Sequence, residues 1–78
     1  MRFPADAPIR RVLRALAALG FRIIDEGEHI ALARDNADGS TTRMTIPNHR
    51  TLKRSTLRTI CRQANISRTD FLAAYEKA

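Results

Sequence analysis

The stretch FRIIDEGEHIALARDNADGSTTRMTIPNH, residues 21–49, decides the fold of this chain. It predicts three antiparallel strands, at residues 21–24, 28–34 and 41–46. Apolar and polar side chains alternate along the second and third of these segments, as they do in strands that cover a core with one face. Gly27 accepts positive φ and therefore favours a tight connection between the first two strands. Asp38-Gly39 favours a turn before the third strand, and Pro47 ends that strand.

The alternation also assigns each side chain of these strands to one face of the sheet. The face expected to cover the helices carries Ile30, Leu32, Met44 and Ile46. The opposite face is expected to carry small and polar side chains, namely His29, Ala31, Ala33, Thr41, Arg43 and Thr45. We therefore expect a flat, open surface on which a large substrate can reach His29.

Amphipathic helices are predicted on both sides of this sheet. The first runs from about residue 8 to residue 19, and its apolar stripe is formed by Ile9, Val12, Leu13, Leu16 and Leu19. Its three arginines, Arg10, Arg11 and Arg14, fall on the opposite face, where they read as a solvated surface. Gly20 is expected to end this helix. Residues 1–7 are expected to form a short tail, with Phe3 against the domain.

The second helix is expected to begin at a Ser55 or Thr56 cap and to end at Ala64, with an apolar stripe of Leu57, Ile60, Cys61 and Ala64. Asn65-Ile66 interrupts it. The sequence Ser67-Arg68-Thr69-Asp70 then predicts a capped, short last helix packed through Phe71, Leu72 and Tyr75. The predicted fold class is therefore α+β: a helix, a three-stranded antiparallel sheet, a helix and a short C-terminal helix.

Composition limits the classes of function. At 78 residues the chain is expected to form one domain, and no apolar run approaches the length of a membrane span. The N-terminal residues lack the apolar segment of a secretory signal. The single cysteine, Cys61, excludes an internal disulfide and fits the reducing cytoplasm, and its place on an apolar stripe favours packing over catalysis.

Charge indicates the kind of partner. Fourteen Lys and Arg residues against eight Asp and Glu give a net charge of +6, and twelve of the fourteen are Arg. Such a chain is expected to bind an anionic partner, which can be a nucleic acid, an acidic protein or a membrane surface. The densest basic series is the candidate phosphate track, formed by Arg50, Lys53, Arg54, Arg58 and Arg62. His, Cys and carboxylate residues show no metal-ligand spacing, so neither a metal nor another cofactor is expected.

Several short motifs, taken together and in order, resemble the HicA toxins of bacterial toxin–antitoxin systems. They are Leu16-x-x-Leu19-Gly20-Phe21, Gly27-x-His29, Pro47-x-His49, Ser55-Thr56-Leu57-x-x-Ile60, and Ile66-Ser67 with Phe71-Leu72. The resemblance implies a single domain over residues 1–78, with a core at about residues 8–75 and a fold like that of double-stranded-RNA-binding domains. It also implies a ribonuclease that cleaves mRNA without a metal and is inhibited by a HicB-like antitoxin.

His29 is the candidate catalytic residue under this resemblance. RNA supplies its own nucleophile, the 2′-hydroxyl, and a histidine near neutrality suits the proton transfer. Arg43 or Lys53 would help to stabilise the phosphate charge. The residues alone favour a surface histidine with no role, and the match at Gly27-x-His29 reverses that preference. His49 is an accessory candidate, although a polar residue in a turn is the simpler interpretation.

The chain departs from the family at Glu28, where the family usually has serine between Gly27 and His29. A carboxylate there would favour the imidazolium form of His29 and would repel RNA phosphate, so activity is expected to be altered or weakened. Two alternatives stay open on the sequence. One is a non-catalytic RNA-binding module, and the other is a protein-interaction subunit whose charge serves only solubility and partner choice.

Overall fold

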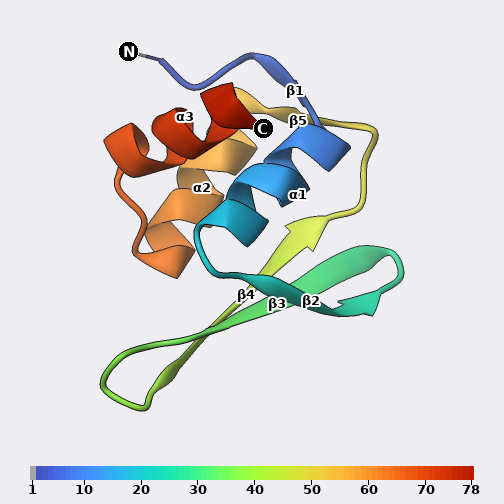
Figure 1. Cartoon of the computed structure of the whole chain (residues 1–78). Helices are drawn as coiled ribbons and strands as arrows, with labels where there is room; N and C mark the ends of the chain where they lie inside the picture. The colour runs from blue at the N-terminus through green and yellow to red at the C-terminus, as the bar shows by residue number, and fades with distance from the viewer. Residues whose placement is uncertain (1) are drawn as a thin grey trace.

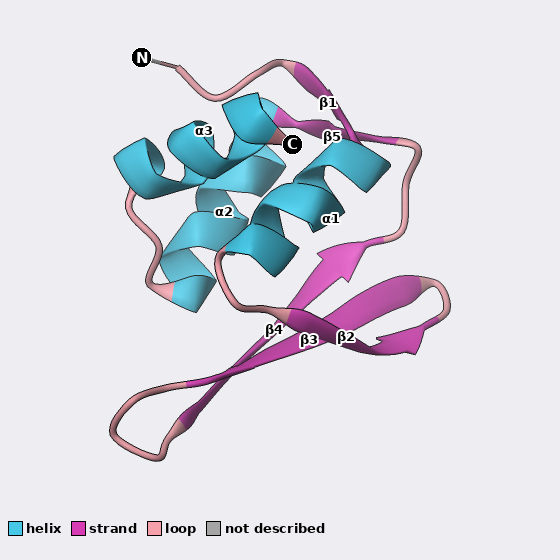
Figure 2. Cartoon of the chain, in the orientation of Figure 1, coloured by secondary structure: helices cyan, strands magenta, loops and turns pink. Residues whose placement is uncertain are grey.

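The computed structural model describes residues 2–78, which form one α+β unit. A three-stranded sheet, a short two-stranded sheet and three helices occur in this part of the chain. The helices lie together on one side of the three-stranded sheet, and the hairpin between its second and third strands extends beyond them (Figures 1 and 2). The predicted order of helix, three-stranded sheet and two helices is confirmed.

The three-stranded sheet consists of β2 (Arg22–Glu26), β3 (His29–Asp35) and β4 (Thr41–Pro47), with β3 in the centre. Both pairings are antiparallel, and His29 lies opposite Pro47 in β4. β2 is longer than predicted and carries a register shift between Ile23 and Asp25. Gly39 has a φ of +89°, so the Asp38-Gly39 turn is confirmed, whereas Gly27 does not adopt positive φ. The backbone bends between β2 and β3 without the left-handed conformation we predicted for Gly27.

The N-terminal residues are not a tail. β1 (Asp6–Pro8) pairs in antiparallel fashion with β5 (Thr51–Lys53), a strand that local sequence did not predict. Phe3 is buried and its ring meets the edge of the Phe71 ring at a centroid distance of 5.8 Å. Residues 3–8 are therefore an integral part of the domain.

The helices are α1 (Ile9–Ala18), α2 (Arg54–Ala64) and α3 (Arg68–Lys77). Gly20 takes a φ of +96° after α1, and the Ser67 hydroxyl accepts a hydrogen bond from the Asp70 amide at the start of α3, both as predicted. The predicted Ser55 or Thr56 cap of α2 is wrong. β5 runs directly into this helix, and extended Lys53 precedes Arg54 with no side-chain cap.

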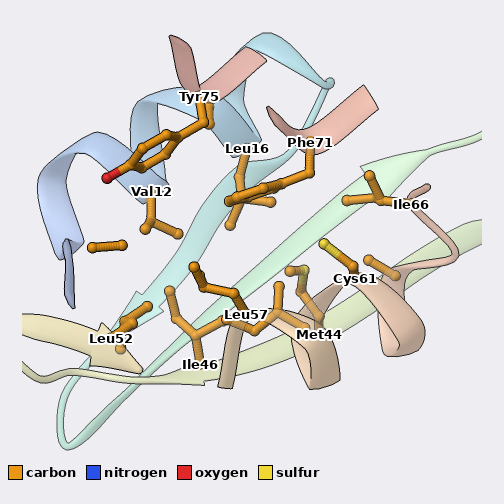
Figure 3. Close-up of a cluster of buried hydrophobic side chains, with 14 of the residues drawn as sticks. Val12, Leu16, Met44, Ile46, Leu52, Leu57, Cys61, Ile66, Phe71 and Tyr75 are labelled. Carbon is orange, nitrogen blue, oxygen red and sulfur yellow. The ribbon is translucent and has the colours of Figure 1, made fainter. Parts of the chain in front are cut away.

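The helices bury their apolar stripes against one face of the sheet. Val12 and Leu16 of α1, Leu57 and Cys61 of α2, and Phe71 of α3 converge on Met44 and Ile46 of β4 (Figure 3). The predicted core face of the sheet is confirmed, because Ile30, Leu32, Met44 and Ile46 are all buried. Arg11 does not lie on a solvated face as predicted, because its guanidinium stacks 4.1 Å from the Tyr75 ring centroid.

No helix within residues 2–78 combines the length and the apolar character needed to cross a lipid bilayer.

Candidate functional site

His29 is the first residue of β3 and its side chain is exposed. The next residue, Ile30, is only 1% exposed and faces the helices. Because successive side chains in a strand point to opposite faces, His29 belongs to the outer face of the sheet. The structure thus places this imidazole where the sequence predicted it, at the end of the central strand and open to solvent.

Asn48 forms two hydrogen bonds with the turn that precedes His29. Its backbone N–H donates to the Glu28 carbonyl at 3.1 Å, and its side-chain amide donates to the Gly27 carbonyl at 2.8 Å. The Gly27 N–H in turn donates to the His29 carbonyl at 3.0 Å. These bonds hold the Gly27–His29 turn against the end of β4. Sequence reasoning did not identify Asn48, and its only local signal is its place directly after Pro47.

Gly27 and Glu28, the two accessory candidates in this turn, are both exposed. A Cβ atom added to Gly27 would meet no other atom within 4 Å, so the glycine is not required for space. Glu28 precedes His29 directly in the chain, so this turn carries an exposed acidic residue. His49 is also exposed and follows Asn48, so both histidines lie at the same end of the sheet.

At the end of the sheet far from His29, two arginines lie on the outer face. Ala33 of β3 pairs with Arg22 on one side and Arg43 on the other. Ala33 is only 1% exposed although we predicted an open position. Both of its cross-strand neighbours, Arg22 and Arg43, carry long side chains, whereas the prediction considered only the alternation along β3. Arg22 also forms an ion pair with Asp35 at 3.1 Å.

Arg43 shares the outer face with His29 but is not its immediate neighbour. Ala33, the partner of Arg43, is four residues along β3 from His29, which corresponds to about 13 Å at the usual rise of a strand. Arg43 therefore lies on the same face of the sheet as His29, while its backbone is well separated from that of His29.

The remaining basic candidates continue along the chain from the His29 end of the sheet. Arg50 and Lys53 are exposed, and they flank or belong to β5. The Arg50 carbonyl accepts a hydrogen bond from the Ile9 N–H at 2.9 Å, which anchors this segment to the start of α1. Lys53 then leads directly into Arg54, the first residue of α2.

Arg54, Arg58 and Arg62 line a groove on the helical side of the molecule, with a cavity volume of about 600 Å³. Arg2 and Arg68 complete its cationic lining. Arg54 is partly buried and donates to the Phe3 carbonyl at 2.8 Å. We call this feature the arginine groove. Its lining comes from α2, the α2–α3 connection and the N-terminal segment. Helix α2 lies away from the β2–β3 turn (Figure 1), so the structure does not bring these three arginines next to His29.

Cys61 packs in the core, as expected. Burial raises the pKa of its thiol to about 11, so the thiol stays protonated at neutral pH and is a poor nucleophile. Within residues 2–78, no three His, Cys, Asp or Glu side chains gather closely enough to hold a metal ion. The chemistry that this surface can offer is proton transfer by an exposed imidazole, with cationic groups placed along the same chain segment.

Comparison with known proteins adds one finding. The sequence model of a family described as the HicA toxin of bacterial toxin–antitoxin systems matches residues 9–66. The matched range includes His29, Asn48 and α2, whereas the N-terminal segment with Phe3 and helix α3 lie outside it. Neither a curated protein nor a solved structure matches the chain.

Proposed function

The chain belongs to the HicA toxin family of bacterial toxin–antitoxin systems, and from this premise we propose that it is an endoribonuclease that cleaves mRNA. His29 is the general acid or base in this proposal. The observation that carries it is the placement of His29: an exposed imidazole at the end of the central strand, on the outer face of the sheet, behind a turn fixed by Asn48.

The proposed reaction uses the nucleophile of the RNA itself. The 2′-hydroxyl attacks the adjacent phosphorus, the bond from phosphorus to the 5′-oxygen breaks, and a 2′,3′-cyclic phosphate and a 5′-hydroxyl are formed. One proton leaves the 2′-hydroxyl and one reaches the departing 5′-oxygen, and His29 performs one of these transfers. His49, at the same end of the sheet, is the candidate for the other.

The cationic residues would hold the RNA rather than transfer protons. Arg43 borders the outer face, and Arg50 and Lys53 continue from the His29 end of the sheet toward Arg54, Arg58 and Arg62. Arginine forks match the geometry of phosphate oxygens, and each neutralised phosphate steepens the salt dependence of binding. We infer an acidic or groove-filling HicB-like antitoxin as protein partner and the cytoplasm as the compartment where the chain meets mRNA.

The test is cleavage of a long RNA by the purified chain in the presence of EDTA. Wild type is expected to cleave, and His29→Ala is expected to lose activity by about a hundredfold or more. Thermal unfolding of His29→Ala should match that of wild type, because the side chain is exposed. His49→Ala, assayed in parallel, decides whether the second imidazole shares the proton transfer.

A second candidate function is a non-catalytic RNA-binding module. The observation that favours it is Glu28, a carboxylate directly before His29 that would repel phosphate at the proposed site. Under this alternative the wild type binds the RNA and leaves it intact at every incubation time. A chain that neither binds nor cleaves RNA, yet captures an antitoxin, would instead be an interaction subunit.

A further inference from the structure

The arginine groove is a feature that residues 9–66 alone do not build. Its lining joins α2 to the N-terminal segment, through Arg2 and Phe3, and to the start of the last helix, through Ile66 and Arg68. The family match stops short of the N-terminal segment and of α3. The bond from Arg54 to the Phe3 carbonyl holds the N-terminal segment against α2, so the groove is part of the folded unit.

The charge of the groove is of one sign. Of its eight lining residues within residues 2–78, five are arginines and none is Asp or Glu. Arg58 and Arg62 are exposed, and no carboxylate in this part of the chain forms an ion pair with either of them. Like charges at i, i+4 repel each other on a helix, so a bound anion would stabilise this arrangement.

The floor of the groove indicates which anion fits. Phe3, Cys61 and Ile66 are 6%, 4% and 9% exposed. They leave little apolar area for the side-chain anchors that dominate protein–protein interfaces. The accessible groups are guanidinium forks, which match phosphate. Arg54, Arg58 and Arg62 follow one another every four residues, or about 6 Å along the helix axis, which suits contacts to successive phosphates of one strand.

The chain segment between His29's end of the sheet and the groove carries two exposed basic residues. The chain runs from Pro47, the β4 partner of His29, to Arg54 in seven residues, a span of at most about 25 Å. Arg50 and Lys53 are exposed along this span. A single RNA strand held at His29 can therefore continue over β5 and reach α2, passing Arg50 and Lys53 and, opposite Lys53 in β1, the carboxylate of Asp6.

We propose that the arginine groove is a second phosphate-binding site, remote from His29, which binds the flanking part of a long single-stranded RNA. The proposal rests on the proposed ribonuclease function and adds a substrate class to it. RNAs that reach from His29 to the groove are preferred substrates, and oligonucleotides that span only the His29 end of the sheet are poor ones. The N-terminal segment, through Arg2 and its support by Phe3, contributes directly to this preference.

The experiment compares two RNAs, one of about 4 nucleotides and one of about 30, which lie at the lower limit of the usual site sizes of single-strand-binding folds and well above their upper limit. Binding is measured by fluorescence anisotropy with 2′-O-methyl RNA, which lacks the nucleophile, and cleavage is measured with ordinary RNA. The groove variant is Arg58→Gln with Arg62→Gln. The matched control is Arg10→Gln with Arg14→Gln, two exposed arginines at the same i, i+4 spacing on α1.

The groove variant is expected to bind the long RNA about tenfold or more weakly and to lose most of the preference for long over short RNA. The slope of its log affinity against log salt should fall by about 1.4, since each lost single-strand contact contributes about 0.7. The control pair should change both quantities much less. Replacing the groove pair by Arg58→Lys with Arg62→Lys should restore most of the salt slope, because lysine keeps the charge.

Equal losses in the groove and control variants would overturn the proposal, because net charge alone would then explain RNA binding. Wild-type RNA binding by the groove variant, with loss of capture of an acidic antitoxin, would also overturn it and assign the groove to a protein. A wild type that cleaves both RNAs equally well removes the groove site and leaves the nuclease, whereas groove-dependent binding without any cleavage removes the nuclease and leaves the groove.

Discussion

The side-chain amide of Asn48 donates a 2.8 Å hydrogen bond to the carbonyl oxygen of Gly27, across 21 residues of sequence. The Asn48 backbone N–H adds a second bond, to the Glu28 carbonyl. Asn48 thus fixes the position of the turn from which His29 enters β3. We regard Asn48 as a positioning residue for the proposed catalytic imidazole, because it contacts the backbone of the turn and not the reacting groups.

Asn48→Ala is expected to lower the rate of RNA cleavage by about tenfold or more, since a displacement of about 1 Å at a catalytic group has a large effect on rate. The loss of one net hydrogen bond should cost only about 1 kcal/mol of unfolding free energy. Both quantities are measured on the same preparation, by single-turnover cleavage and by urea unfolding.

Asn36→Ala is the matched control for the Asn48 variant. The Asn36 side chain closes the β3–β4 turn at the other end of the sheet, where it donates to Ser40 Oγ at 3.0 Å and to Thr42 Oγ1 at 2.9 Å. It should lose at least as much stability as Asn48→Ala, because more than one side-chain hydrogen bond is removed, and it should keep wild-type cleavage. If Asn48→Ala also cleaves RNA at the wild-type rate, the hydrogen bonds of Asn48 stabilise the fold but do not position His29 for catalysis.

Glu28→Ser, which introduces the residue that the family usually has, is expected to increase RNA cleavage about fivefold. The reason is that an exposed carboxylate about 4 Å from a phosphate contributes about 1 kcal/mol of repulsion in water. The gain should shrink as salt is raised, because the charges are exposed. Glu26→Ser removes another exposed carboxylate, from the end of β2, and serves as the control. Equal gains from both variants would point to net charge and not to the place of Glu28.

Phe3→Ala is expected to reduce the free energy of unfolding by about 3 kcal/mol, the scale of removing a buried aromatic ring from a core. The ring packs edge-on against Phe71, and this contact would be lost. Urea unfolding of the variant at an unchanged m-value measures the effect, with Phe3→Leu as a conservative comparison that should cost less. A loss below about 0.5 kcal/mol, the scale of a surface substitution, would contradict the packing of the N-terminal segment described above.

The stability of the fold is expected to fall between pH 9 and pH 11 because of Cys61. Burial raises the pKa of this thiol from 9.0 to about 11. Between these values the unfolded chain has lost the thiol proton and the folded chain still binds it. Unfolding therefore becomes more favourable by about 1.4 kcal/mol for each pH unit. Below pH 9 the thiol is protonated in both states and contributes no pH dependence.

The measurement is urea unfolding of wild type and Cys61→Ala at several pH values from 8 to 11. The difference between the two curves isolates the thiol from the other groups that titrate in alkali. The wild type should lose stability more steeply than the variant over this range. If the stabilities of wild type and variant fall in parallel with pH, folding does not raise the pKa of the Cys61 thiol.

Patterns among neighbouring residues correctly predicted much of the fold. The period-two alternation in residues 28–34 and 41–46 correctly placed Ile30 and Met44 in the core, and it placed His29 on the outer face, where the structure has it. Gly20, the Asp38-Gly39 turn and the Ser67 cap behave as predicted, because each depends on backbone preferences of a few adjacent residues.

Local patterns failed where distant segments meet. The residues near Phe3 and Thr51 show no strand pattern that predicts the β1–β5 pair. Strands of only three residues are stabilised by pairing with a partner strand more than by their own strand propensity. Arg11 carries no local sign that it will stack on Tyr75, 64 residues away. The predicted serine or threonine cap of α2 does not form, because the chain is still extended at Lys53, the last residue of β5, and the helix begins at Arg54.

The sequence by itself determined the α+β order, the two faces of the sheet, the exposed His29 and the basic character of the segment from Arg50 to Arg62, since periodicity and charge are properties of neighbouring residues. Only the tertiary structure decided that Asn48 holds the His29 turn, that Arg43 lies about 13 Å along the strand from that imidazole, and that Arg2 and Arg68 join the α2 arginines around one groove. These relationships depend on how separate segments pack against a shared core, and such packing leaves no repeat or spacing in the chain.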